Sequence, residues 1–197
     1  MSTFARTLLP VVRRLCREAG PALACLLVAA ACILAMTWPW CLHFDGSFLN
    51  HWDPPFHAWK LEVLARKILS GDLLLRNADT PLFYPYSGTL YYEALTWPVA
   101  LAAATLTAWT SWSPEFIYHV ILIAGWSLAA PCMQHFLRGL GLNRTAAFTG
   151  GVLFCILPYR MSYANEFQMQ LVFALPLFYG LLVRLLTRPS ARGGIAL

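Results

Sequence analysis

The sequence predicts an all-α integral membrane protein with about four transmembrane helices. Apolar residues make up 59% of the chain, charged residues make up only 12%, and the mean hydropathy is +0.58. Soluble globular domains carry about 25% charged residues, so this composition argues against that class. Several uncharged runs approach the length of about 20 residues that one bilayer crossing requires. The chain therefore has room for a small bundle of membrane helices and for no large soluble domain.

The first transmembrane helix is predicted over residues 19–42, where no charged residue occurs. Four arginines precede it: Arg6, Arg13, Arg14 and Arg17. Because positive charge concentrates on the cytoplasmic side, we expect residues 1–18 in the cytoplasm. A cleaved signal peptide is the alternative, but its apolar core is typically about 7–15 residues long, which is shorter than this run. We expect an uncleaved helix, and the Arg-, Ala- and Leu-rich composition is compatible with a bacterial inner (plasma) membrane.

Three further spans are predicted over residues 116–137, 145–159 and 167–187, whereas the uncharged run 94–112 is expected not to cross. If that run also crossed, the loop with Arg138 and Arg144 would lie outside, against the charge bias. With four spans, this loop and the tail, residues 189–197, lie in the cytoplasm. Residues 43–115 then form a long external loop within one membrane module, residues 19–188. The run 94–112 is expected at the outer interface or as a re-entrant helix.

An amphipathic helix is predicted near the start of that external loop. Asp53 followed by two prolines is a typical helix start, and the pair Ser70-Gly71 is a typical end. Apolar residues recur with helical spacing at positions 61, 64, 65, 68 and 69, with charged residues 60, 62, 66 and 67 on the opposite side. We expect the helix to lie on the membrane surface, with an ion pair between Glu62 and Arg66.

Three segments follow one another along the chain: "DPPFHAWKLEVLARKIL", "FYPYSGTLYYEALTWPVALAAATLTAW" and "LPYRMSYANEFQMQ". In this order they resemble the N-terminal membrane module of GT-C class glycosyltransferases, a class that includes oligosaccharyltransferase catalytic subunits and bacterial polyprenyl-phosphate-sugar-dependent transferases. The resemblance implies one span, an external loop with a juxtamembrane helix and a non-crossing helix, and a later short external loop with an Asp-Asn-Glu or Asp-x-Asp element. It covers most of residues 20–188 and only the first portion of a usual enzyme, so we expect a truncated chain.

The resemblance implies the site residues. Asp53 matches the first-loop aspartate, which in the family acts at the metal or as the base for the acceptor. Tyr84, with Pro85 and Gly88, matches a Tyr-Pro-Gly-like turn, and Asn165 and Glu166 match the end of the Asp-Asn-Glu element. Ala164 stands where the family has the first acid of that element. A divalent metal ion, as a cofactor, would therefore rest on Asp53 and Glu166.

Chemical reasoning supports some of these roles and leaves alternatives open. Transfer of a sugar to a hydroxyl needs a base, so Asp53 and Glu166 are the candidate catalytic residues. Arg160 is a candidate for binding the phosphate of the donor, although an arginine at a helix end can equally extend toward the headgroups. Asp53 can also be no more than a helix cap. His57, with His51 on the other side of Asp53, is a candidate for substrate binding or an interfacial histidine.

We therefore expect a membrane glycosyltransferase, or its N-terminal fragment, that moves a sugar from a polyprenyl-phosphate donor to an acceptor at the external face. The alternative is a non-catalytic membrane scaffold or a small transporter subunit with a GT-C-like fold. The expected partners are the lipid-linked donor and membrane lipid. Nucleic acid is not expected, because the net charge of +5 comes mainly from arginines near the ends of apolar runs. The six cysteines have no metal-type spacing and are expected to be small core residues.

Overall fold

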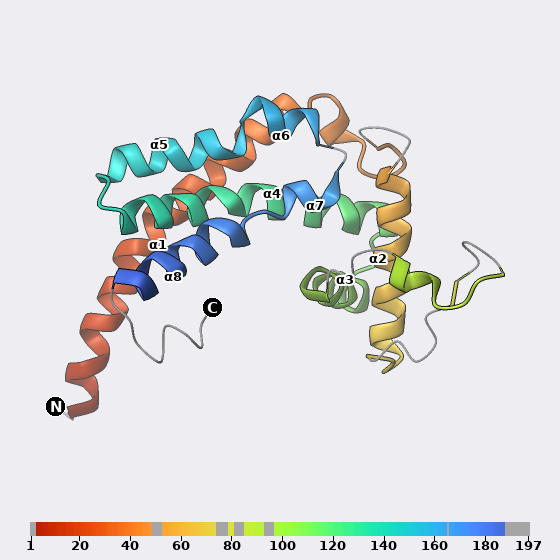
Figure 1. Cartoon of the computed structure of the whole chain (residues 1–197), viewed down its shortest axis with the longest axis horizontal. Coiled ribbons are helices and arrows are strands. Elements are labelled where there is room, and N and C mark those ends of the chain that lie inside the picture. The colour runs from red at the N-terminus through yellow and green to blue at the C-terminus, as the bar shows by residue number, and fades with distance from the viewer. Residues whose placement is uncertain are drawn as a thin grey trace. The chain divides into compact units, whose positions relative to one another are not determined.

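The computed structural model describes residues 3–48, 53–73, 79–80, 85–92, 97–164 and 166–187, and every regular element in these ranges is helical (Figure 1). The predicted all-α class is thus confirmed for the described part of the chain. The elements are α1 (Thr3–Met36), η1 (Trp40–Leu42), α2 (Asp53–Leu69), η2 (Thr89–Tyr92), α3 (Trp97–Trp109), α4 (Pro114–Gly139), α5 (Arg144–Cys155), α6 (Pro158–Ser162), α7 (Phe167–Gln170) and α8 (Ala174–Thr187).

Among the described residues, two helices are long and apolar enough to cross a membrane: Ala19–Met36 of α1 and Pro114–Gly139, the whole of α4. They coincide with the first two predicted spans. The first ends at Met36 rather than at residue 42, because the chain turns and then forms η1. Pro39, which has no backbone N–H to donate, lies in this turn.

The third and fourth predicted spans are not single long helices. Helix α5 has 12 residues, so at about 1.5 Å per residue it is about 18 Å long, well short of the ~30 Å of a bilayer core. It ends before Pro158, and a residue before proline disfavours the helical conformation. The segment 167–187 is divided into α7 and α8 by three residues that are not in a helix. Pro176 is the third residue of α8, where a missing N–H costs no helical hydrogen bond.

The chain divides into two compact units. The first unit consists of residues 1–38, 123–164 and 168–197. Within it, α1 packs against α5. Gly151 of α5 lies close to both α1 and α4, because a Cβ there would be 3.1 Å from Cys25 Sγ and 2.5 Å from the carbonyl oxygen of Ala130. The Trp126 indole donates to the carbonyl oxygen of Cys155 at 2.8 Å, between α4 and α5. All five cysteines with described side chains are free, and three of them are buried, as expected of small core residues.

The second unit consists of residues 39–122 and 165–167. Its main contact is between α2 and α3, where Leu64, Leu90 and Ala100 form a small core. Helix α2 begins at Asp53, as predicted, and ends in a Schellman motif at Gly71, whose φ of 85° favours glycine. In this motif the Gly71 N–H donates to Ile68 at 3.0 Å and the Asp72 N–H donates to Lys67 at 2.9 Å. Both predicted ends of the helix are therefore correct.

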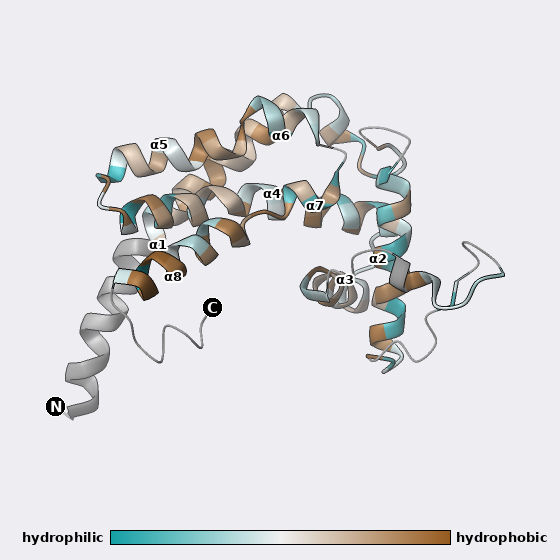
Figure 2. Ribbon diagram, viewed as in Figure 1, coloured by the Kyte–Doolittle hydropathy of each residue, from teal (hydrophilic) through white to brown (hydrophobic). Residues whose placement is uncertain are grey.

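The faces of α2 differ in part from the prediction. The expected ion pair is present, with Arg66 Nη2 2.6 Å from Glu62 Oε1. Lys60, however, was expected on the polar face and is only 3% exposed, with its Nζ 5.6 Å from the ring centroid of Phe56. Leu69 was expected on the apolar face and is 50% exposed. Helix α2 also packs against α3, a contact that the prediction of a surface-lying helix did not include. Figure 2 shows the mixed character of α2, where hydrophilic and hydrophobic residues alternate.

Candidate active site

Two of the predicted site residues lie on the first two turns of α2. Asp53 is the first residue of the helix and is exposed to solvent. His57 follows four residues later, so it lies on the same side of the helix, one turn further on. Its ring is buried, with 4% of the residue exposed, against the ring of Phe56 at 5.7 Å. The polar side of α2 therefore runs from an exposed carboxylate to a buried imidazole.

Phe167 joins this part of α2 to the segment that carries Glu166. The ring of Phe167 lies 5.8 Å from that of His57 and stacks on Tyr118, in α4, at 5.2 Å with an interplanar angle of 28°. It is 2% exposed. Because Glu166 immediately precedes Phe167, this packing brings the predicted acid of the late loop to the same unit as Asp53. Both predicted catalytic residues therefore belong to the unit that contains this buried aromatic contact.

Tyr118, in α4, is a further candidate that the sequence did not indicate. It is 1% exposed, and its hydroxyl has no hydrogen-bond partner among the described residues. An unpaired buried hydroxyl costs roughly 1–3 kcal/mol, so its retention makes Tyr118 a candidate for binding. The sequence signal was weak, because one tyrosine in an apolar helix start is typical of a membrane interface.

Next to Tyr118, His119 has a structural task. Its Nδ1 lies 3.0 Å from the carbonyl oxygen of Phe44, and its ring contacts the rings of Trp40, Phe44 and Phe48 at 4.9–5.2 Å. His119 is fully buried. These contacts fix the chain that follows η1 against the start of α4, which holds the neighbouring Tyr118 in place.

The candidate site supplies only some of the ligands that a divalent cation such as Mg²⁺ requires. No group of three or more His, Cys, Asp or Glu side chains that could hold a metal ion occurs in the part of the chain that the structure describes. Asp53 and Glu166 are two carboxylates, which fit Mg²⁺ when water and substrate phosphate supply the remaining ligands. Ala164, at the position of the family's first acid, is 7% exposed and has no ligating atom. Any metal site here would be completed by the substrate.

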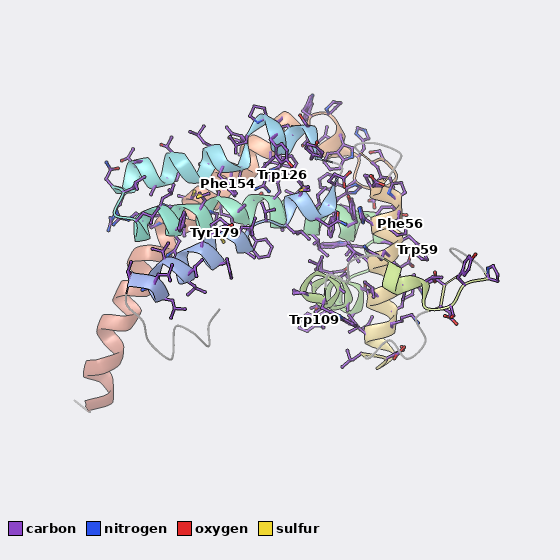
Figure 3. The ribbon with its side chains drawn as sticks, viewed as in Figure 1. Phe56, Trp59, Trp109, Trp126, Phe154 and Tyr179 are labelled. Carbon is purple, nitrogen blue, oxygen red and sulfur yellow. The ribbon has the colours of Figure 1, made fainter. Side chains whose placement is uncertain are left out.

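Arg160 is not positioned as the sequence predicted for a phosphate ligand or for an arginine at the headgroups. It is 3% exposed, its Nη2 donates to the backbone oxygen of Gln170 at 3.0 Å, and its guanidinium lies 5.3 Å from the ring centroid of Phe154. Figure 3 labels Phe154 on α5. An arginine side chain remains charged at neutral pH. The charge is therefore turned inward, toward Gln170.

The remaining predicted site residues have different outcomes. Asn165 and Tyr84 lie outside the described residues. Gly88, which was expected in a turn with Tyr84, has a φ of 67°, and its N–H donates to Asp79 Oδ1 at 2.6 Å. The hydroxyls of Thr80 and Thr89 are 2.7 Å apart and close the same turn. Asp79 is thus committed to the turn and is not a candidate for catalysis.

No protein-family model, curated protein or solved structure matches the chain.

Proposed function

We propose that this protein is a membrane glycosyltransferase, or the N-terminal part of one, which transfers a sugar from a polyprenyl-phosphate donor to an acceptor hydroxyl at the external face. The observation that supports the proposal is that Asp53 and Glu166, 113 positions apart in the sequence, belong to one compact unit, in which Phe167 contacts the rings of His57 and Tyr118. The Tyr118 hydroxyl of the same unit is buried without a partner among the described residues, which calls for an explanation such as a bound ligand. The resemblance to GT-C enzymes names the same two acids.

The reaction assigns a task to each group. The acceptor oxygen attacks the anomeric carbon of the donor sugar, the bond from that carbon to the phosphate oxygen breaks, and polyprenyl phosphate leaves. Asp53 takes the proton of the acceptor hydroxyl, because it is the exposed carboxylate of the pair. Glu166 is half-buried and orients the acceptor through a hydrogen bond. The Tyr118 O–H is available to donate to a substrate oxygen.

The proposed membrane arrangement has four crossings. The N-terminus is cytoplasmic, α1 and α4 cross as single helices, and the segments α5–α6 and α7–α8 complete the other two crossings with help from their non-helical residues. Residues 43–115, with α2 and α3, lie at the outer surface. Helix α3 has 13 residues, about 20 Å, which is too short to cross alone. The proposed location is the bacterial inner membrane.

Topology has its own test. A cysteine introduced by Ser190→Cys, in a background without the native cysteines, should resist an impermeant thiol reagent added outside intact cells. A cysteine introduced by Ser87→Cys, in the external loop, should react. Labelling at position 190 would contradict the four-span arrangement.

Activity is tested with the full chain in lipid vesicles and a radiolabelled polyprenyl-phosphate hexose or pentose as donor. We expect the label to leave the lipid fraction when an envelope extract supplies the acceptor, and Asp53→Asn to reduce the rate about 10²–10⁴-fold. Glu62→Gln is the matched control, because Glu62 lies on the same helix and its partner is Arg66. Equal rates for Asp53→Asn and the wild type would remove Asp53 from the mechanism.

One observation favours a second function, a non-catalytic membrane subunit with a similar fold. Ala164 replaces an acid that the resemblance leads us to expect, and it is buried rather than solvent-facing. A scaffold predicts no donor turnover by the wild type and equal phenotypes for Asp53→Ala and Glu62→Ala in cells. The transfer assay therefore separates the two functions directly.

A further inference from the structure

Helix α3, which belongs to the second unit, buries its small residues and exposes its large ones. Its buried residues are Ala100, Ala103 and Ala104, and Ala100 packs with Leu64 of α2. Leu101 is 50% exposed, and Trp109 is 86% exposed. A helix in a water-soluble protein turns its large apolar side chains toward the core, whereas helices that pack within a membrane place small residues at their contact. The burial of α3 therefore follows the membrane pattern.

The exposed side of α3 carries no charge. Residues 94–114 contain no Asp, Glu, Lys or Arg. Five exposed residues recur along α3 at helical spacing, and we call them the outer face: Pro98, Leu101, Ala102, Thr105 and Trp109. On α2, by contrast, the exposed residues include Arg66. An uncharged and largely apolar face that extends over the whole helix suits hydrocarbon better than water.

The hydroxyl groups of α3 are satisfied by the helix itself. Thr105 Oγ1 donates to the backbone oxygen of Leu101 at 2.8 Å, and Thr107 Oγ1 donates to that of Ala103 at 2.9 Å. Thr110, directly after the helix, donates in the same way to the carbonyl oxygen four positions earlier, also at 2.8 Å. Each hydroxyl thus has a hydrogen bond that needs no water, as hydrocarbon requires of every polar group.

The chain holds α3 close to a candidate membrane span. Trp109 precedes Pro114, the first residue of α4, by five positions, which extend over at most about 18 Å. Helix α4 is long and apolar enough to cross a membrane. Between the two helices, Trp112 is 44% exposed, and its ring lies 4.9 Å from that of Phe116 in α4. Because tryptophans concentrate at the headgroups, we expect the end of α3 and the start of α4 at the same membrane face.

We propose that the outer face of α3 is a lipid-contact surface, which lies in the hydrocarbon of the leaflet where α4 begins. Helix α3 has 13 residues and is about 20 Å long, so it enters the leaflet without crossing the membrane. The second unit then contacts the membrane through α3, and α2 is held by α3 rather than lying on the membrane by itself. The proposal requires that α4 crosses a membrane, and it does not depend on sugar transfer.

Lipid contact is tested with a nitroxide spin label on the full chain in phosphatidylcholine vesicles. In a background without the native cysteines, the label is attached after Leu101→Cys on the outer face. Arg66→Cys on α2 is the matched control, because this position is also exposed. We measure collisions of each label with oxygen and with a polar nickel chelate. The ratio of oxygen to chelate collisions should be about tenfold higher at position 101, because hydrocarbon excludes the chelate.

Two outcomes of the spin-label experiment would overturn the proposal. Equal ratios at positions 101 and 66 would place the outer face of α3 in water. Protection of position 101 from both oxygen and the chelate would mean that protein covers this face, either another part of the chain or a second copy of it.

A second measurement keeps the native cysteines, so it remains valid if their removal disturbs the fold. The wild-type chain in the same vesicles is photolysed with a membrane-soluble diazirine reagent, and the labelled residues are identified by mass spectrometry. We expect labelling at Leu101, Ala102 and Thr105 and none at Glu62 or Arg66. Labelling at Arg66, or no labelling within α3, would contradict the proposal.

Neither measurement uses the transfer reaction, so the two proposals fail separately. If the wild type transfers no sugar, the proposed function fails, and the label at position 101 still decides whether α3 contacts lipid. If transfer is observed and position 101 lies in water, only the lipid contact fails.

Discussion

The two units differ in the candidate chemistry that they hold, although each buries both bonded and unbonded polar atoms. In the first unit, the buried indole of Trp126 donates to a backbone oxygen at 2.8 Å, whereas two guanidinium nitrogens of Arg160 have no partner among the described residues. In the second unit, which contains α2, the buried hydroxyl of Tyr118 has no partner within the described residues. Both candidate acids, Asp53 and Glu166, belong to this second unit. We therefore propose that the second unit carries the chemistry.

The variant that tests this difference between the units most strongly is Tyr118→Phe. The hydroxyl makes no hydrogen bond in the described structure, so its removal should leave the thermal stability in detergent unchanged or slightly higher. The rate of sugar transfer should fall about tenfold to a hundredfold, because a donor to the substrate is lost. A loss of stability with full activity would place Tyr118 among the structural residues.

The counterpart in the other unit is Trp126→Phe. This change removes the hydrogen bond from the indole to the carbonyl oxygen of Cys155 and leaves that oxygen buried. We expect a loss of roughly 1–3 kcal/mol of unfolding free energy, measured by thermal unfolding in detergent. The transfer rate per folded molecule should not change. A large loss of kcat with unchanged stability would mean that the first unit also takes part in catalysis.

Packing within the first unit is tested by a pair of glycines. Gly151→Ala should cost about 1–3 kcal/mol, because the new methyl group would lie 2.5 Å from the backbone oxygen of Ala130. Gly139→Ala, at the end of α4, meets nothing within 4 Å and should be neutral or slightly stabilising. Equal melting temperatures for both variants would contradict the close approach of α4 and α5.

The smallest expected effect is at the exposed ion pair of α2. Arg66 is largely exposed, with 74% of its side chain accessible, so Glu62→Ala should change stability by no more than about 0.5 kcal/mol. The effect should shrink further at high salt. A loss above about 1 kcal/mol would show that this ion pair contributes more to stability than an ordinary exposed pair does.

Local chemistry made parts of the fold predictable from the sequence. The ends of α2 follow from Asp53 with its prolines and from Gly71, and the ion pair of Glu62 with Arg66 follows from helical spacing. The lengths of the later helices and the contacts between helices were not predictable in the same way. Hydropathy merged α7 and α8 into one span, because the three residues between them are as apolar as the helices. The burial of Lys60 depends on the packing of α2 within its unit, which spacing along one helix does not contain.

For the candidate site, the sequence indicated the two acids but not the residues that pack near them. Asp53 and Glu166 were named from a resemblance, but nothing in the order of residues indicated that Phe167 would pack between His57 and Tyr118. Arg160 was a candidate for the donor phosphate, with an arginine that extends toward the headgroups as the alternative. Its inward direction follows from Gln170, ten residues later, and a guanidinium bonded to a backbone oxygen is a tertiary feature.

The central claim is that Asp53 and Glu166 act at one site. The measurement that tests it most directly is the transfer rate of the full chain in vesicles for Asp53→Asn, Glu166→Gln and the double variant. Groups that act as a unit are non-additive, so the double variant should be no slower than the worse single variant within about threefold. If the two losses multiply, the carboxylates act independently and the single-site account is wrong.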